Sequence, residues 1–278
     1  MTWALIRKEL LTNLLTYRLA VALIFTVTLS ALTTFIGSVD FSTNMDAYRT
    51  EVRSQAEELE QATVYEQTQQ RVILPPQPLA IFSRGLTGLV PQNYWVGLDY
   101  VGRAPWAMNQ GSLNPYMKAL GQIDFVTVVT LLLSFLAVVL GYDGICGERE
   151  RGTLKVMLTN PVPRAQVVLG KLVGGVISLW IPLTMAFLVC LLIVLANGDV
   201  AFSAGDWARV GVLFGVTCLF LAQVFALSLL VSTLVRDSDT SLIICLFFWL
   251  VGGVGYITAL PSLSRYGHEE KPHQAYMN

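Results

Sequence analysis

Uncharged apolar stretches alternate with polar segments along the whole 278-residue chain. Each apolar stretch is long enough to cross a hydrocarbon core about 30 Å thick, which takes roughly 20 residues of α-helix. None of the stretches contains Asp, Glu, Lys, Arg or His. The pattern therefore predicts an all-α fold, a polytopic transmembrane helical bundle. Five spans are visible: residues 19–39, 125–142, 172–196, 210–235 and 241–260.

The composition agrees with this class, because 54% of the residues are hydrophobic and only 13% are charged. A soluble domain carries about a quarter of charged residues. The first apolar stretch is too long for the core of a signal peptide, so we expect a retained span. The four cysteines lie in or beside apolar runs, which is typical of small buried hydrophobes rather than of disulfides or metal ligands.

Basic residues in short loops predict the orientation, because such loops stay on the cytoplasmic side. Five of these residues lie in the loop 143–171 and three more precede the first span, whereas the loop between the third and fourth spans holds only Arg209. We therefore expect the N-terminus and the loop 143–171 to be cytoplasmic. The segment 40–124 and the polar tail 261–278 are then external.

Residues 1–18 carry apolar side chains at helical spacing. These are Trp3, Ile6, Leu10, Leu14 and Tyr17. The spacing predicts a cytoplasmic amphipathic helix that lies in the membrane interface before the first span. A frayed cytoplasmic end is the alternative.

The external segment 40–124 begins with a polar stretch rich in Glu and Gln. An apolar stripe predicts a helix over 45–72 with one packed face. The stripe consists of Met45, Tyr48, Val52, Ala56 and Leu59. The prolines of ILPPQPLAIF end that helix, and the Gly, Pro and aromatic residues that follow predict a small irregular cap with an aromatic belt at the membrane surface.

The sequence lacks the patterns of reactive groups that catalysis needs. In a nucleotide-binding P-loop the lysine is followed by Ser or Thr, but here Leu172 follows Gly170 and Lys171. Carriers driven by ion gradients place ionisable groups inside the bilayer, whereas the predicted spans hold none. The sequence has no H-E-x-x-H or G-x-S-x-G motif, and both histidines lie in the polar tail. We therefore expect a chain that is not an enzyme and has no metal or cofactor of its own.

The loop 143–171 combines a dense charge cluster with an apolar patch. The patch has the i, i+3, i+4 spacing of one helix face and consists of Leu154, Met157 and Leu158. Glu148 and Glu150 suit the start of this helix, and Asn160 before Pro161 ends it. A short helix with an apolar face and a charged rim is typical of one half of a protein–protein interface. The alternative is a patch that rests on the bilayer.

The sequence GYDGICGERERGTLKVMLTNPVPRAQVVLGK, residues 141–171, resembles the segment after the second span of ABC-2 type permeases. That family has a Glu-Arg-Glu-x-Gly-Thr-Leu core, here 148–154, then Asn/Tyr-Pro-Val-x-Arg, here 160–164, and a Leu-Gly-Lys entry into the third span. The opening IRKEL, residues 6–10, resembles the family's interfacial start. The segment LPPQPLAIFSRGL, residues 74–86, resembles a subgroup with a large external segment between spans 1 and 2.

The resemblance implies that the chain is the membrane-spanning permease subunit of an ABC transporter, an exporter in the bacterial cytoplasmic membrane. A separate ABC ATPase subunit would bind ATP and magnesium and dock on the loop 148–164. The implied ATPase-coupling interface comprises Glu148, Arg149, Glu150, Arg151, Gly152, Thr153, Leu154, Met157, Leu158, Asn160, Pro161 and Arg164. Further implied partners are a second permease copy or a paralogous permease, membrane lipid and an external protein, with no nucleic acid.

Two questions stay open at the level of sequence. The alternative function is a non-transporting membrane anchor that passes ATPase strokes to an external partner. The family usually has six spans, so five visible spans indicate a shortened member, a partner chain that supplies the sixth span, or a fragment.

Overall fold

The computed structural model describes residues 2–61, 70–83, 85, 93–96, 101–103, 123–153 and 163–255. The chain divides into two compact units, and each is described by itself. Unit 1 comprises Met1–Ala22, Thr130–Trp180 and Leu219–Asn278, and unit 2 comprises Leu23–Val129 and Ile181–Cys218. Helices α2, α8 and α9 contribute residues to both units.

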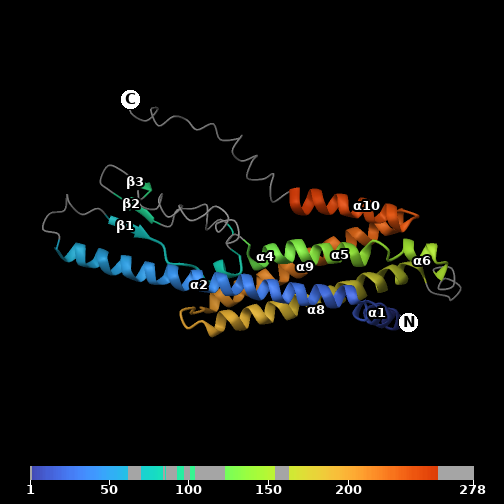
Figure 1. Cartoon of the computed structure of the whole chain (residues 1–278), viewed down its shortest axis with the longest axis horizontal. Helices are drawn as coiled ribbons and strands as arrows, with labels where there is room; N and C mark the ends of the chain where they lie inside the picture. Colours follow the sequence, from blue (N-terminus) through green and yellow to red (C-terminus); the bar gives the residue numbers. More distant parts are fainter. Residues whose placement is uncertain are drawn as a thin grey trace, which may run out of the picture. The chain divides into compact units, whose positions relative to one another are not determined.

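Helices dominate the part of the chain that the structure describes (Figure 1). They are α1 (Thr2–Leu14), α2 (Tyr17–Gln61), α4 (Phe125–Val128), the π-helical η4 (Val129–Leu133), α5 (Ser134–Gly141), α6 (Cys146–Glu150), α8 (Arg164–Ala196), α9 (Ala204–Leu234), α10 (Ser238–Trp249) and the π-helical η5 (Leu250–Gly255). Among the described residues, four helical stretches are long and apolar enough to cross a membrane: 17–60, 125–150, 164–196 and 204–234. A shorter apolar helix covers 238–253. The predicted polytopic helical bundle is confirmed.

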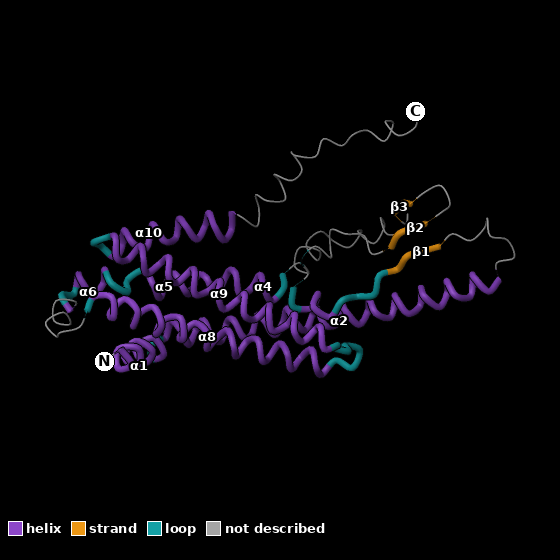
Figure 2. The backbone as a smooth tube through the Cα atoms, turned by 180° about the vertical axis from the view of Figure 1, so that it is seen from behind, coloured by secondary structure: helices purple, strands orange, loops and turns teal. Residues whose placement is uncertain are grey.

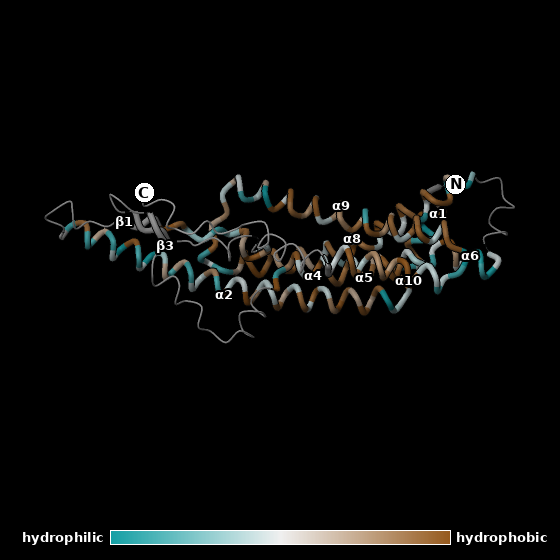
Figure 3. Tube along the Cα trace, turned by 90° about the horizontal axis from the view of Figure 1, so that it is seen from above, coloured by the Kyte–Doolittle hydropathy of each residue, from teal (hydrophilic) through white to brown (hydrophobic). Residues whose placement is uncertain are grey.

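Helix α2 differs from its prediction because it continues without a break from the apolar stretch into the polar one. Its 45 residues correspond to a length of about 65 Å, roughly twice the thickness of a hydrocarbon core. The colour along α2 changes from brown to teal in Figure 3, so polarity changes while the conformation does not. Residues 38–61 contain no glycine or proline, and nothing in the local sequence stops the helix.

The predicted helix over 45–72 is wrong at its far end. Helix α2 ends at Gln61, and residues Gln70–Ile73 form strand β1. Only the first part of the predicted packed face is covered, because Met45 and Tyr48 are half-buried whereas Val52 and Leu59 are exposed.

Three short strands form a small sheet, two of them within the region for which the sequence predicts an irregular cap. Most of that region (84, 86–92, 97–100 and 104–122) lies outside the described residues. Strand β2 (Asn93–Val96) pairs antiparallel with β1 on one side and with β3 (Val101–Arg103) on the other, with Arg71 opposite Trp95 and Tyr94 opposite Arg103. The strands are drawn in orange in Figure 2. The pairing of β1 with β2 joins residues 20–26 positions apart, so local periodicity could not predict it.

Unit 2 has an aromatic core that holds the segment after β1. The 3₁₀ helix η2 (Pro78–Ile81) brings Ile81 against Gly37 of α2. Phe82 follows η2 and is fully buried. Its ring lies 6.3 Å from the ring of Phe125 and 5.9 Å from that of Phe187, which in turn lies 4.8 Å from Phe214 (centroid distances). We call Phe82, Phe125, Phe187 and Phe214 the aromatic cluster. It joins η2 to α4, α8 and α9.

Polar contacts close the end of α8 against α2 in unit 2. The Asn197 side-chain amide donates to Ser38 Oγ at 2.7 Å and to Ser42 Oγ at 2.9 Å. The guanidinium of Arg49 lies 3.2 Å from a carboxylate oxygen of Asp199. These contacts fix the loop that connects α8 with α9 to the side of α2.

Unit 1 packs α5, α9 and α10 closely together. Val138, Val231 and Cys245 form its buried core. A side chain at Gly141 would collide with Ser228 of α9. The Trp249 indole N–H donates to Ser134 Oγ at 2.8 Å, which joins the residue after η4 to the residue before η5. Helix α6, where the charged loop begins, contacts α9 and α10.

Candidate functional site

Helix α6 contains the first residues of the charged loop, and a residue far along the chain holds its N-terminus. Ser232 Oγ of α9 accepts hydrogen bonds from the backbone N–H groups of Ile145 (3.0 Å) and Cys146 (3.1 Å). Ser232 is fully buried. It supplies the acceptor that an N-cap side chain normally gives to its own helix.

Gly152 explains why α6 is only one turn long. Its φ of +72° lies in the left-handed region that glycine adopts without a steric penalty and that commonly ends helices. The hydroxyl of Thr153 donates to the carbonyl of Glu148 at 3.2 Å. The Gly-Thr pair of the motif therefore turns the chain sharply after α6.

Arg149 binds the C-terminal end of α9. Its guanidinium donates to the carbonyl of Val235 at 3.2 Å and to that of Thr233 at 3.4 Å. Carbonyls at a helix C-terminus have no intrahelical partner and carry partial negative charge, so a cation stabilises them.

Glu150 binds the N-terminal end of α10. Its carboxylate accepts from the backbone N–H of Ser238 at 2.7 Å and from the Ser238 hydroxyl at 2.8 Å. Asp237 occupies the N-cap position of α10 but makes no side-chain cap bond. Glu150 thus performs the capping role from another helix.

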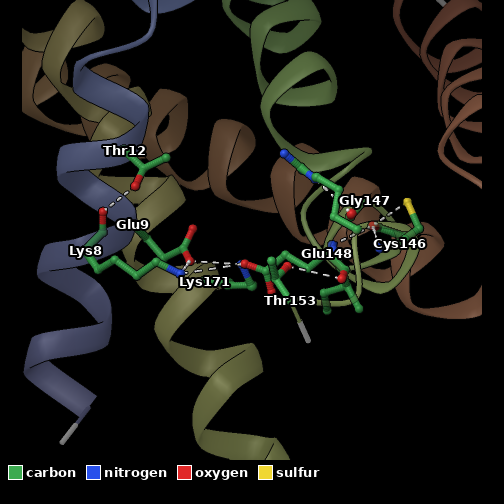
Figure 4. Close-up of polar contacts among 11 residues, drawn as sticks. Lys8, Glu9, Thr12, Cys146, Gly147, Glu148, Thr153 and Lys171 are labelled. Carbon is green, nitrogen blue, oxygen red and sulfur yellow. Dashed lines mark hydrogen bonds and ion pairs between the residues drawn. The ribbon is translucent and has the colours of Figure 1, made fainter. Parts of the chain in front are cut away.

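Glu148 points to a third neighbour, the buried ammonium of Lys171 in α8. Lys171 Nζ lies 2.8 Å from Glu148 Oε1 and 2.9 Å from Glu9 Oε1 of α1 (Figure 4). The Lys171 side chain is only 5% exposed, and the two carboxylates are 14–15% exposed. Lys8 Nζ lies 3.8 Å from each of the same oxygens but is 55% exposed. Two acids and two bases therefore meet at this point.

The burial of Lys171 makes this arrangement geometrically demanding. A buried ammonium loses its hydration, at an effective penalty of several kcal/mol, and only close, well-aligned acceptors offset it. Both distances fall in the range of charge-assisted hydrogen bonds. Glu148 Oε2 is buried without a hydrogen-bond partner among the described residues. Glu9 and Glu148 therefore each pair with Lys171 through one carboxylate oxygen.

Helix α1 lies directly against α8 near this cluster. A Cβ added at Gly174 would lie 2.8 Å from Glu9 Cβ, and one added at Gly170 would lie 3.2 Å from Leu5 Cβ. The Asn13 amide donates to Ser178 Oγ at 3.3 Å. The two glycines, one helical turn apart, let the backbones approach closely.

The predicted apolar stripe of residues 1–18 is divided between two environments. Ile6 and Leu10 are half-buried, whereas Trp3 and Tyr17 are 73% and 77% exposed. Location of α1 in the membrane interface stays a prediction. The split arises because α8 takes part of the apolar face that the sequence assigned to lipid.

The structure places the predicted coupling residues as follows. Glu148, Arg149 and Glu150 contact other helices of unit 1, Arg151 donates through Nε to Gly147 O at 3.0 Å, Gly152 and Thr153 form the turn, and Arg164 begins α8 at the surface. Leu154, Met157, Leu158, Asn160 and Pro161 lie outside the described residues, so the apolar patch stays a prediction.

Sequence reasoning missed several members of the site. The sequence places Lys171 at the end of the loop 143–171, whereas it lies inside α8 and is buried. Glu9, Ser232 and Ser238 were not assigned any role. One signal existed: Glu9 is the only acidic residue before the first span. We call Glu9, Glu148, Arg149, Glu150 and Lys171 the charged cluster.

Comparison with known proteins agrees with this architecture. A family model described as ABC-2 family transporter protein matches residues 3–276. Two similar proteins are each named probable ABC transporter permease protein NosY. The one from Pseudomonas aeruginosa is 31% identical over 156 residues, which cover 51% of this chain and 57% of the relative. The one from Stutzerimonas stutzeri is 37% identical over 79 residues, which cover 25% of this chain and 29% of the relative.

These alignments thus extend over little more than half of the first relative and less than a third of the second. The family model, by contrast, covers nearly the whole chain. On that match, the chain belongs to the ABC-2 family of transporter proteins.

Proposed function

We propose that the chain is the membrane-spanning permease subunit of an ABC transporter and that a separate ATPase subunit docks on the loop 148–164. One observation carries this proposal. Three consecutive residues at the start of that loop, Glu148, Arg149 and Glu150, bind α8, α9 and α10 respectively. A displacement of the loop is therefore passed to three helices through short, directional contacts.

The proposal assigns the remaining parts of the system. The ATPase subunit binds ATP and magnesium, and this chain contributes no catalytic group and no cofactor. The N-terminus and the loop 148–164 face the cytoplasm of a bacterium, and the chain lies in the cytoplasmic membrane. A second permease copy or a paralogous permease completes the membrane part of the transporter. Membrane lipid covers the exposed apolar faces of α2, α8 and α9. The direction of transport is export.

Two observations in unit 2 favour a second candidate, an anchor that passes ATPase strokes to an external protein. Helix α2 continues for 45 residues, far beyond the length that a bilayer requires. The aromatic cluster packs the segment after β1 against α4, α8 and α9, so that segment follows the helices when they move. A transporter gives substrate-stimulated ATP hydrolysis in liposomes, whereas an anchor responds to the external protein.

Replacement of Leu158 by aspartate tests the docking. Leu158 shares the predicted apolar patch with Leu154 and Met157, so Leu158→Asp places a charge in the centre of the proposed interface, and we expect a loss of about 2 kcal/mol or more in ATPase binding. The spans carry the free energy of membrane insertion, so the variant reaches normal membrane levels but no longer co-purifies the ATPase.

The matched control is Leu158→Met, which keeps volume and polarity and is expected to be nearly silent. Wild-type ATPase stoichiometry with Leu158→Asp would contradict the docking. The patch would then rest on the bilayer, as the alternative interpretation of the sequence holds.

A further inference from the structure

Lys171 is a buried cation at which three elements meet. Its ammonium binds Glu148 of α6 and Glu9 of α1 while its own backbone lies in α8. Figure 4 shows the Lys171 side chain between the two acids. The acids come from positions 162 and 23 residues away. The IRKEL segment, the Glu-Arg-Glu core and the Leu-Gly-Lys entry thus converge on one atom.

We propose, building on the proposed function, that Lys171 is a positioning residue for the loop 148–164, on which the ATPase subunit docks. Its ammonium fixes Glu148 and Glu9 at a single point, so that α1, α6 and α8 follow the docked ATPase as one body. Helix α1 becomes part of the moving assembly rather than a passive membrane attachment.

Packing alone already keeps α1 beside α8. The Gly170 and Gly174 contacts with Leu5 and Glu9 and the Asn13–Ser178 hydrogen bond do not require the ammonium. For α6, however, the bond between Glu148 and Lys171 is the hydrogen bond with α8 that the described residues show, and the exposed Lys8 of α1 lies farther from Glu148, at 3.8 Å. The charge is therefore needed to join α6 to the α1–α8 pair.

The chemistry of the cluster fits positioning better than simple stabilisation. Replacing a buried ion pair by apolar residues of similar volume is often neutral or stabilising, whereas a retained pair fixes one geometry. The unpartnered Oε2 of Glu148 also shows that the cluster is not optimised for stability alone. A charge-assisted hydrogen bond at 2.8–2.9 Å requires a short distance and a defined donor angle, which restricts α6 to a narrow set of positions.

A neutral triple variant separates positioning from folding. Glu9→Gln, Glu148→Gln and Lys171→Met together remove the charges, keep the side-chain sizes and leave no unpaired buried ion. The variant is compared with the wild-type chain in liposomes, each in complex with the ATPase that co-purifies with the wild type. We expect normal membrane levels and a wild-type amount of bound ATPase, with the ATP hydrolysis rate reduced about tenfold, within the range of measured coupling effects.

A distance measurement reports on the joint movement directly. Spin labels at Thr153, in the turn after α6, and at Leu169 of α8 sit at exposed positions, and the native cysteines are buried or half-buried. In the wild-type complex, trapping with ATP and vanadate leaves the distance between the labels unchanged. In the triple variant, trapping shifts or broadens that distance because α6 no longer moves together with the α1–α8 pair.

Two controls complete the experiment. Lys171→Arg alone keeps the positive charge, and we expect a hydrolysis rate close to that of the wild type and well above that of the triple variant. If Lys171 only filled space, the presence of a charge at this position would not affect the rate. Arg209→Met removes a basic residue whose side chain is 66% exposed in an ion pair with Asp206, and it leaves the rate unchanged.

Each outcome has one meaning. A wild-type rate and an unchanged label distance in the triple variant would overturn this inference and leave the proposed function intact. Loss of ATPase binding or of membrane insertion in the triple variant would assign the cluster to docking or folding, and would also overturn it. A wild-type chain that binds no ATPase would overturn the proposed function itself, and the inference with it.

Discussion

The charged cluster of unit 1 and the aromatic cluster of unit 2 both join segments that are distant in sequence, but they do so with different interactions. In unit 1, single atoms decide the geometry, because each acid or base has a specific partner at 2.7–3.4 Å. In unit 2, four rings share their contacts at centroid distances of 4.8–6.3 Å. Ring contacts have no fixed donor–acceptor geometry, whereas a charge-assisted hydrogen bond requires a short distance and a defined donor angle.

This difference suits the two proposed roles. The loop 148–164 must pass its displacement to the helices without a change in the contacts between them, and directional hydrogen bonds to helix ends do this. A segment that only has to follow its neighbours needs contact area, and the rings supply it. The following variants compare the two clusters.

The largest effect is expected for Lys171→Met alone. It leaves Glu9 and Glu148 without their shared cation, and we expect the free energy of unfolding to fall by about 3–5 kcal/mol, as for other broken buried pairs. Thermal unfolding in detergent, followed by thiol labelling of the fully buried Cys146, measures this loss. Lys8→Met is the matched control, because Lys8 is 55% exposed and its loss costs less than about 1 kcal/mol. Equal melting of the two variants would contradict the described pairing.

Phe82→Ala opens a cavity in the aromatic cluster of unit 2. We expect a loss of about 3 kcal/mol, near the lower end for a buried Phe, because neighbouring rings can partly close the space. Phe82→Leu keeps most of the volume and should cost less than about 1.5 kcal/mol. The same melting experiment measures both variants. A silent Phe82→Ala would show that the segment after β1 is held by other contacts.

Glu150→Gln tests the cap that α6 provides for α10. The amide still accepts from Ser238 but lacks the charge that favours a helix N-terminus, so we expect a loss of about 1 kcal/mol. The rate of hydrogen exchange in the first turn of α10 should rise by the factor to which this loss of free energy corresponds. Glu57→Gln, at an exposed position of α2, controls for the general loss of a carboxylate. Unchanged exchange in α10 would show that Glu150 does not act as its cap.

Arg49→Ala should have the smallest effect. The Arg49 side chain is 48% exposed and pairs with Asp46 and Asp199 at the surface. Such pairs contribute less than about 1 kcal/mol, and salt screens them further. Melting curves at low and high salt should differ for the wild type slightly more than for the variant. A loss comparable to that of Lys171→Met would remove the contrast between buried and exposed charges.

The candidate site shows which parts of a sequence are readable. The Glu-Arg-Glu-x-Gly-Thr core can be recognised from the sequence, because charge between apolar spans is a local feature, and its use as an ATPase-coupling interface stays a prediction. The roles of its residues were not readable. Glu150 caps a helix that begins 88 positions later, and Arg149 binds carbonyls 84 and 86 positions away.

The sequence by itself determined the membrane helices, since hydropathy is a sum over neighbouring residues and requires no partner. The continuation of α2 past Asp40 follows from a local feature as well, because no glycine or proline stops the helix there. The turn at Gly152 was not predicted, because the sequence pattern assigns the Glu-Arg-Glu core to the start of the same helix as the apolar patch, whereas α6 ends at Glu150 and Gly152 adopts a φ of +72°. The tertiary structure decided that Lys171 is buried and that residues 70–73 form a strand rather than a helix. Each of these two outcomes depends on a partner far along the chain. The free energy of such contacts exists only once the fold has brought the partners together.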